Sequence, residues 1–287
     1  MRLVSYRAGA TLEPGVVVAG QVHDLAGLLG SGVRSTRELL ERHGGDLAAL
    51  AAAVDAAVAA GGARVGELAD VVLGPPVPDP AKVLCVGLNY RDHVAETGRT
   101  PPAHPDLFAK FASSLVGPAD DLVLTQVSAK LDYEGELAVV IGRPCRNVAP
   151  EQALDCVAGA MVLNDTSARD LQFNGTQWLP GKAVDGSTPC GPALVTLDEV
   201  GDLQALELVT RVNGAEVQRS STSLQIFPVA TVVAYVSRFL ALAPGDVIST
   251  GTPDGVGSRM DPPSFLAAGD VVEVEIERLG ALRTTVR

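Results

Sequence analysis

The chain has 287 residues, and its 34 Asp and Glu side chains outnumber its 22 Lys and Arg side chains, which gives a formal net charge of −12. Nucleic acids and anionic membranes bind proteins through basic patches, so we expect neither as a partner. Apolar residues make up 47 % of the chain, enough for a substantial core, and no stretch reaches the roughly 18–20 apolar residues of a membrane span.

The first part of the chain predicts a small α/β unit. Residues 1–23 form short apolar runs around Pro and Gly turns and predict strands, whereas residues 36–60 predict one or two helices that end at Gly61-Gly62. Four prolines follow between Pro75 and Pro80, and proline continues neither a helix nor a central strand. We therefore predict a linker here, with a small N-terminal domain at 1–76 and a larger domain at 77–287.

The larger domain predicts mostly strands. Apolar runs separated by Gly, Pro, Asn and Asp predict strands, and two segments predict helices, at 150–159 and 228–242. The predicted strands lie at 82–89, 121–127, 135–142, 157–165, 193–197, 206–214, 246–251 and 270–279. This order of elements predicts a β-rich α+β fold.

Three acidic residues lie where predicted core strands begin or end. Residues 131–141 predict one strand, in which Glu134 and Glu136 project to the same face because side chains alternate. Two solvated acids on an exposed strand edge would explain this pair as well. However, Asp165 follows the apolar run 160–163, and three converging carboxylates repel one another unless a cation joins them. Oxygen ligands of this kind favour Mg²⁺, Mn²⁺ or Ca²⁺ over zinc.

Residues 87–98, GLNYRDHVAETG, predict a short helix after a strand, with Asn89 as its N-cap. His93 and Glu96 are then neighbours on one helix face, and a carboxylate beside an imidazole orients and strengthens a general base. A His–Glu pair on a short helix is also a common surface contact. Residues 92–105 include the Gly- and Pro-rich segment GRTPPAHP and predict a lid that orders when ligand binds.

Two further segments carry polar groups whose function the residues alone leave open. Lys182, in PGKAVDG, predicts a solvent-facing lysine on a loop when it is judged in isolation. Residues 251–257, GTPDGVG, lack the GxxxxGK[ST] pattern of a phosphate loop and predict a tight turn.

Segments of this chain occur in the order that one enzyme family uses: VGLNYRDHVAE, FAKFASSLVGP, DYEGELAVVIG, NDTSARDLQ, QWLPGK and STGTPDGVG. Together they resemble the fumarylacetoacetate hydrolase (FAH) family over residues 82–287. The resemblance implies an α+β fold with an FAH-type mixed β-roll/β-sandwich catalytic domain, commonly homodimeric. The first 76 residues resemble the small N-terminal α/β domain of the shorter bacterial members.

The resemblance also implies a metal centre and a catalytic pair. Glu134, Glu136 and Asp165 match the positions that hold Mg²⁺ or Mn²⁺ in the family, and Ca²⁺ is a further candidate. His93 and Glu96 match the family's water-activating dyad, carried on a mobile lid.

The remaining matched positions concern the substrate. The resemblance implies that Lys182 is catalytic and that Arg169, Gln172 and Thr252 contact substrate. Two positions depart from the common pattern, because Ala112 replaces a frequent proline and no aromatic residue follows Lys182. These departures leave the metal ligands unchanged and affect the expected identity of the substrate.

The family's substrates are small 2-oxo acids, and its reactions share one enolate that a metal ion stabilises. Because the His93–Glu96 pair is intact, we predict hydrolysis of a C–C bond in an acylpyruvate- or fumarylpyruvate-like 2,4-dioxo acid. Alternatives are an oxaloacetate-type decarboxylase, a 2-hydroxyhepta-2,4-diene-1,7-dioate isomerase of aromatic catabolism and, more remotely, a non-enzymatic domain stabilised by metal. The four cysteines are scattered without a CxxC pair and no signal peptide is recognised, so we expect a cytoplasmic protein.

Overall fold

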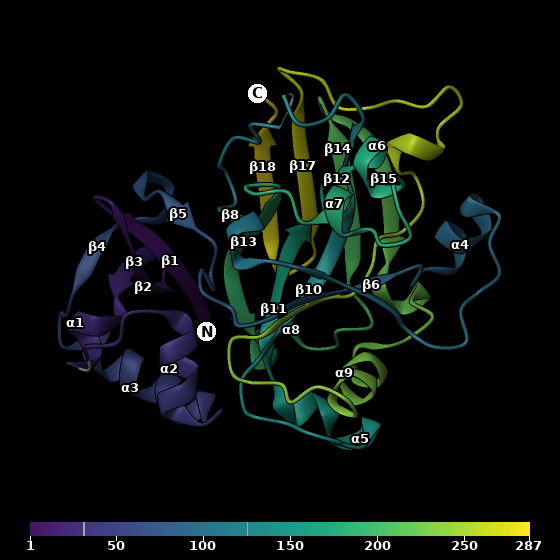
Figure 1. Cartoon of the computed structure of the whole chain (residues 1–287). Helices are drawn as coiled ribbons and strands as arrows, with labels where there is room; N and C mark the ends of the chain where they lie inside the picture. The colour runs from purple at the N-terminus through teal and green to yellow at the C-terminus, as the bar shows by residue number, and fades with distance from the viewer. Residues whose placement is uncertain (31, 125) are drawn as a thin grey trace.

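The computed structural model describes residues 1–30, 32–124 and 126–287 (Figure 1). Most strands belong to one long mixed sheet with the order β4-β3-β2-β1-β13-β11-β10-β16-β6-β7. No helix in the described ranges is long and apolar enough to cross a membrane.

The N-terminal elements lie together at one end of the long sheet (Figure 1). They are the strands β1 (Arg2–Ala8), β2 (Thr11–Val18), β3 (Gln21–Asp24) and β4 (Arg64–Glu67) and the helices α1 (Leu25–Leu29), α2 (Thr36–His43) and α3 (Leu47–Ala59). Helix α2 begins where the Ser35 side chain accepts a hydrogen bond from the Glu38 amide, and it ends at Gly44 with φ +55°. Two helices therefore occupy the predicted range. Strand β1 pairs with β13, so the N-terminal strands extend the sheet of the larger part.

The centre of the long sheet is buried on both faces. Its strands are β6 (Val83–Gly87), β10 (Gly135–Ile141), β11 (Val157–Asn164), β13 (Thr188–Thr196) and β16 (Val247–Ser249), and the partly buried β7 (Asp106–Lys110) forms the edge beyond β6. In β10, Leu137 and Val139 pack into one hydrophobic cluster, whereas Ala138 and Val140 pack into a second cluster that includes Leu50 of α3. A strand with apolar neighbours on both faces is a rigid support for the residues at its ends.

A second sheet of order β15-β14-β17-β18 packs against the middle of the long sheet. Its strands are β14 (Glu207–Val212), β15 (Ala215–Ser221), β17 (Val271–Ile276) and β18 (Gly280–Thr285). Leu208, Val274 and Leu282 share the hydrophobic cluster of Leu137 and Val139. The helices α5 (Pro150–Ala153) and α9 (Val229–Ser237) lie together away from this second sheet (Figure 1).

Two predicted strands differ from the structure. The predicted strand 131–141 divides into β9 (Leu131–Asp132) and β10, because the amides of Glu134 and Gly135 donate to the side chains of Asn164 and Gln218. The predicted strand 121–127 includes a residue outside the described ranges. Its described residues form only an isolated bridge, from Leu122 to the C-terminal segment, and the strands that flank it in the chain are β8 (Leu115–Val116) and β9.

Candidate active site

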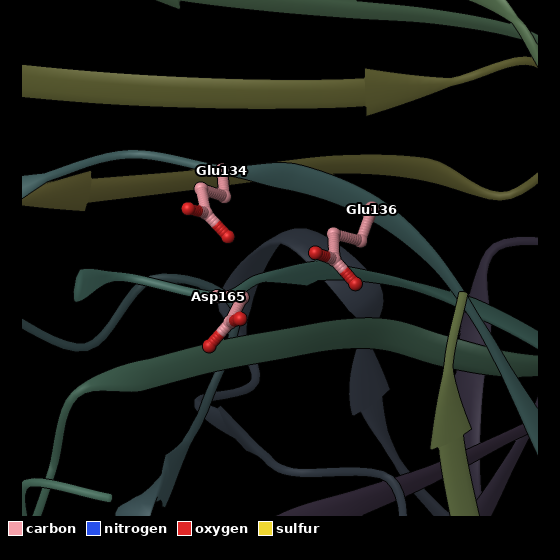
Figure 2. Close-up of side chains that lie close together, drawn as sticks. All are labelled: Glu134, Glu136 and Asp165. Atoms are coloured by element: carbon pink, nitrogen blue, oxygen red, sulfur yellow. The ribbon is translucent and has the colours of Figure 1, made fainter. Parts of the chain in front are cut away.

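The pairing of β10 with β11 brings the three predicted metal ligands together. Glu134 directly precedes β10, Glu136 is its second residue, and Asp165 directly follows β11. One carboxylate oxygen of each residue lies within 4.8 Å of the others, and all three residues are buried. Figure 2 shows the three side chains close together. We call these three residues the acid cluster.

The chemistry of the acid cluster fits a divalent cation. Burial, together with the charges of Asp165 and Glu134, raises the pKa of the Glu136 carboxyl well above its ordinary value, so its negative charge lacks compensation. Its Oε2 atom accepts hydrogen bonds from Ser249 Oγ at 2.5 Å and from the Gly251 amide at 2.9 Å, which fixes the carboxylate. Three fixed, buried oxygen ligands suit Mg²⁺ or Mn²⁺.

Two buried lysines pair with the acid cluster. Lys182 Nζ lies 2.5 Å from Glu134 Oε2 and 2.6 Å from Asp165 Oδ2, and Lys110 Nζ lies 2.6 Å from Asp165 Oδ1. Burial alone would lower the pKa of Lys182, but the charges of Asp165 and Glu134 outweigh it and raise that pKa. Lys110 and Lys182 together hold the Asp165 carboxylate in a fixed orientation.

The position of Lys182 corrects the interpretation drawn from its own segment. Lys182 ends the short helix α7 (Leu179–Lys182) and is buried. Its ion pairs with two carboxylates replace the hydration that the ammonium group loses on burial. Sequence reasoning missed Lys110 altogether. Its one signal was a lysine at the end of an apolar run, in the segment FAKFASS that carried the family resemblance.

Arg169 links Glu134 of the acid cluster to Asp132, which in turn binds the loop at Gly257 and Ser258. It begins helix α6 (Arg169–Gln172), and its guanidinium pairs with Glu134 at 2.7 Å and with Asp132 at 2.8 Å. Its Nη1 also donates to Gln172 Oε1 at 2.9 Å. Asp132, which sequence reasoning also missed, accepts from the amides of Gly257 and Ser258. Of the predicted substrate-binding residues, Arg169 is therefore held by two carboxylates of the site and Gln172 is held by Arg169.

The predicted His–Glu pair is in contact. His93 and Glu96 lie on helix α4 (Arg91–Thr97), and His93 Nδ1 lies 3.0 Å from Glu96 Oε2. The other oxygen of Glu96 accepts from the Gly255 amide at 3.0 Å, so the carboxylate is held from two sides. The predicted N-cap role of Asn89 is wrong. Tyr90 occupies that position, and the Asn89 side chain instead binds backbone groups of Phe227 and Thr250, which lie on other segments.

Residues 251–257, predicted as a tight turn, form an irregular loop with one bend, and this loop is part of the wall of the site. Gly251 has φ +98°, and a side chain there would meet the Asn89 Cβ at 2.8 Å. Thr252 Oγ1 accepts from Gln218 Nε2 at 2.9 Å, and that side chain also donates to the Pro253 carbonyl. The loop thereby presents the predicted substrate-binding Thr252 to the same space as the acid cluster.

These segments enclose a cavity of about 240 Å³. Seven of the nine predicted site residues line it: His93, Glu134, Glu136, Arg169, Gln172, Lys182 and Thr252. Glu96 and Asp165 lie behind this lining and bind His93 and the two lysines. Phe108 and Trp178 form an aromatic part of the wall, with ring centroids 5.6 Å apart. Trp178 approaches so closely that a Cβ on Gly87 would lie 2.6 Å from its ring.

Comparison with known proteins agrees with this architecture. The model of the fumarylacetoacetate (FAA) hydrolase C-terminal domain matches residues 82–287. The chain belongs to the fumarylacetoacetate hydrolase family. It is 40 % identical to the mitochondrial oxaloacetate tautomerase fahd2 of Xenopus laevis, over all of this chain and 90 % of that protein. It is 43 % identical to the 2,4-didehydro-3-deoxy-L-rhamnonate hydrolase of Sphingomonas sp. (strain SKA58), over 96 % of this chain and 92 % of that protein.

A solved structure of a relative carries both a metal ion and a 2-oxo acid. Maleylpyruvate hydrolase from Sphingobium sp. SYK-6, in complex with manganese(II) ion and pyruvate, superposes with a TM-score of 0.81 at 31 % identity, over all of this chain and 98 % of that one. The predicted family and α+β fold class are thereby confirmed, and the chain is an FAH-family enzyme. The domain boundary near residue 76, the residue roles and the homodimer stay predictions.

Proposed function

We propose that this enzyme uses a divalent cation, Mg²⁺ or Mn²⁺, to hydrolyse a C–C bond in a 2,4-dioxo acid. The observation that supports it is the His93–Glu96 pair, because His93 lines the same cavity of about 240 Å³ as Glu134 and Glu136 of the acid cluster. The reaction consumes one water: a 2,4-dioxo acid becomes a carboxylic acid and pyruvate when the bond between C3 and C4 breaks.

His93 would act as the base that activates the water. A carboxylate only accepts hydrogen bonds, so the contact with Glu96 places the imidazole proton on Nδ1 and leaves Nε2 free to take a proton. Glu96 stabilises the positive charge that this transfer creates on the ring. The Gly255 amide donates to the second oxygen of Glu96, so the carboxylate that orients the ring is itself held by another segment.

The acid cluster and its neighbours would orient the 2-oxo acid. Glu134, Glu136 and Asp165 would hold the cation, which when bound supplies positive charge that stabilises the enolate oxygen formed as C3 departs. The Lys182 ammonium lines the cavity and adds a second positive charge beside that oxygen. The Thr252 hydroxyl lies in the same lining and would help to fix the carboxylate.

A second candidate is keto–enol tautomerisation of oxaloacetate. It is favoured by the 40 % identity with the Xenopus laevis tautomerase, which extends over the whole of this chain. That reaction moves one proton between C3 and the C2 oxygen and involves no attack by water. Decarboxylation of oxaloacetate and isomerisation of a hydroxydiene-dioate likewise involve no attack by water and need no hydroxide. The requirement for a water-activating base therefore separates hydrolysis from all three.

The test measures hydrolysis and tautomerisation in the same protein and its variants. Purified protein with Mg²⁺ or Mn²⁺ is expected to release pyruvate from 2,4-dioxopentanoate and to stop when EDTA is added. His93→Ala is expected to lower this rate by ~10²–10⁴-fold, Glu96→Gln by less, and the control His43→Ala on α2 not at all.

Oxaloacetate tautomerisation, followed by the absorbance of the enol, is expected to fall much less in His93→Ala than pyruvate release does. Hydrolysis that survives this substitution would contradict the role of the dyad. Rapid tautomerisation without pyruvate release from a panel of 2,4-dioxo acids would favour the second candidate.

A further inference from the structure

We propose that Arg99 and Arg259 form a second anion-binding position at the mouth of the cavity, so that the preferred substrate is a dianion. Its 2-oxo acid end would face the acid cluster, and a carboxylate at its other end would bind these two arginines. The inference rests on the proposed function, because it names the substrate class of the same site.

A continuous wall leads from the acid cluster to Arg99. Lys182 Nζ, which binds the acid cluster, lies 5.1 Å from the centroid of the Phe108 ring. The Phe108 ring meets Trp178 edge to face at 5.6 Å, and the Arg99 guanidinium lies over the Trp178 ring at 6.0 Å. Lys182 is buried and Arg99 is exposed, so this order runs from the interior of the cavity to its mouth. Two aromatic rings therefore separate the positive group at the bottom from the one at the mouth.

Both arginines lie on segments whose backbone is tied to the site. Arg99 follows the C-terminus of α4, the helix that Glu96 joins to the Gly255 amide. Arg259 ends the short 3₁₀ helix Gly257–Arg259, whose first two amides donate to Asp132. These backbone contacts keep both segments beside the same cavity, which Arg99 and Arg259 line.

The two arginines at the mouth differ from the other cationic residues of the site in their pairing. Arg169 and Lys182 pair with carboxylates, but among the described residues no carboxylate pairs with Arg99 or Arg259. Both nevertheless line the cavity of a protein with a net charge of −12. Unpaired guanidinium groups at the mouth attract an anion and bind a carboxylate through two parallel hydrogen bonds. A ligand with an apolar tail would leave them merely solvated.

Binding tests the position without relying on catalysis. The single tryptophan of the chain, Trp178, lines the cavity, so its fluorescence reports occupancy. We would titrate 2-oxo diacids of five to seven carbons, in the presence of Mg²⁺, against 2-oxo monoacids of the same length. At least one diacid is expected to bind about 10-fold or more tightly than its matched monoacid, because hydrogen bonds between charged groups contribute enough free energy for such a difference.

Substitutions assign that preference to the two arginines. Arg259→Gln is expected to reduce it, and the double variant with Arg99→Gln is expected to abolish it while the affinity for monoacids stays unchanged. Arg238→Gln, an exposed arginine that does not line the cavity, is the matched control and is expected to behave as the wild type. Equal affinities of the wild type for diacid and monoacid at every length, or a preference that persists in the double variant, would overturn the proposal.

Kinetics then separate this inference from the proposed function. The dianion 2,4-dioxoheptanedioate differs from 2,4-dioxoheptanoate only by a carboxylate in place of a methyl group, and its kcat/KM is expected to be higher by at least the binding preference. Equal kcat/KM values would overturn the anion position and leave hydrolysis established. No hydrolysis of either compound, with the arginine-dependent binding preference intact, would overturn the proposed function and leave the anion position standing.

Discussion

Replacing Glu136 with glutamine separates metal binding from folding. Glu136 accepts from Ser249 Oγ and the Gly251 amide, and it has no lysine or arginine partner among the described residues. A glutamine carbonyl oxygen accepts both hydrogen bonds. The substitution also removes a negative charge that burial, Asp165 and Glu134 all disfavour. We therefore expect Glu136→Gln to fold normally and to lose most of its affinity for the cation.

The structure sets the expected magnitudes. Replacing the two charge-assisted hydrogen bonds of Glu136 by uncharged ones lowers the free energy of unfolding by up to ~1–2 kcal/mol in total. The loss of repulsion from Asp165 and Glu134 offsets part of this decrease. A net change within about 1 kcal/mol shifts the Tm of a chain of this size by roughly 2–4 °C. Cation at 100 times its Kd stabilises the wild type by about 2.7 kcal/mol, which corresponds to roughly 5–10 °C. The loss of the cation response is therefore larger than the direct effect of the substitution.

Thermal unfolding in EDTA and in excess Mg²⁺ or Mn²⁺ measures both quantities. Wild type and the exposed-acid control Glu277→Gln are expected to show the full rise in Tm with cation, whereas Glu136→Gln shows little or none. The two variants and the wild type are expected to melt at similar temperatures in EDTA. A Glu136→Gln protein that cation stabilises as much as the wild type would refute the assignment of Glu136 as a ligand.

Three further predictions concern the surroundings of the acid cluster. Lys110→Met leaves Asp165 with one cation fewer and is expected to destabilise the protein by roughly 3–5 kcal/mol in urea unfolding. The double variant with Asp165→Asn should lose less stability than the sum of the two single changes. Additive losses would contradict the pairing of Lys110 with Asp165. Residues 92–105 are expected to exchange amide hydrogens more slowly when oxalate and Mg²⁺ are present, and equal, strong protection in both states would refute a lid. Gly87→Ala is expected to displace Trp178, because the new Cβ would lie 2.6 Å from its ring, and unchanged Trp178 fluorescence with unchanged kcat/KM would contradict that close contact.

The parts of the site that the sequence predicted are those that local pattern determines. Strand periodicity placed Glu136 and Asp165 at the ends of buried strands, and helical spacing placed His93 beside Glu96. Local pattern failed where a distant segment competes for a backbone or side-chain group. Asn89 is polar and precedes a helix, yet it binds segments about 140 and 160 residues away instead of capping that helix.

Long-range charge pairing explains why the sequence left the electrostatics of the site incomplete. Four carboxylates, at residues 132, 134, 136 and 165, meet three buried or nearly buried cations, Lys110, Arg169 and Lys182. A lysine side chain is buried only when its charge is paired. The burial of each lysine is therefore explained only when the carboxylates of other strands lie beside it. Within the described part of the chain one negative charge remains uncompensated, and it belongs to Glu136, for which the structure shows no salt bridge. A divalent cation held by the acid cluster, as we propose, would compensate that charge and leave a net positive charge, which is what an anionic 2-oxo acid requires of the site that binds it.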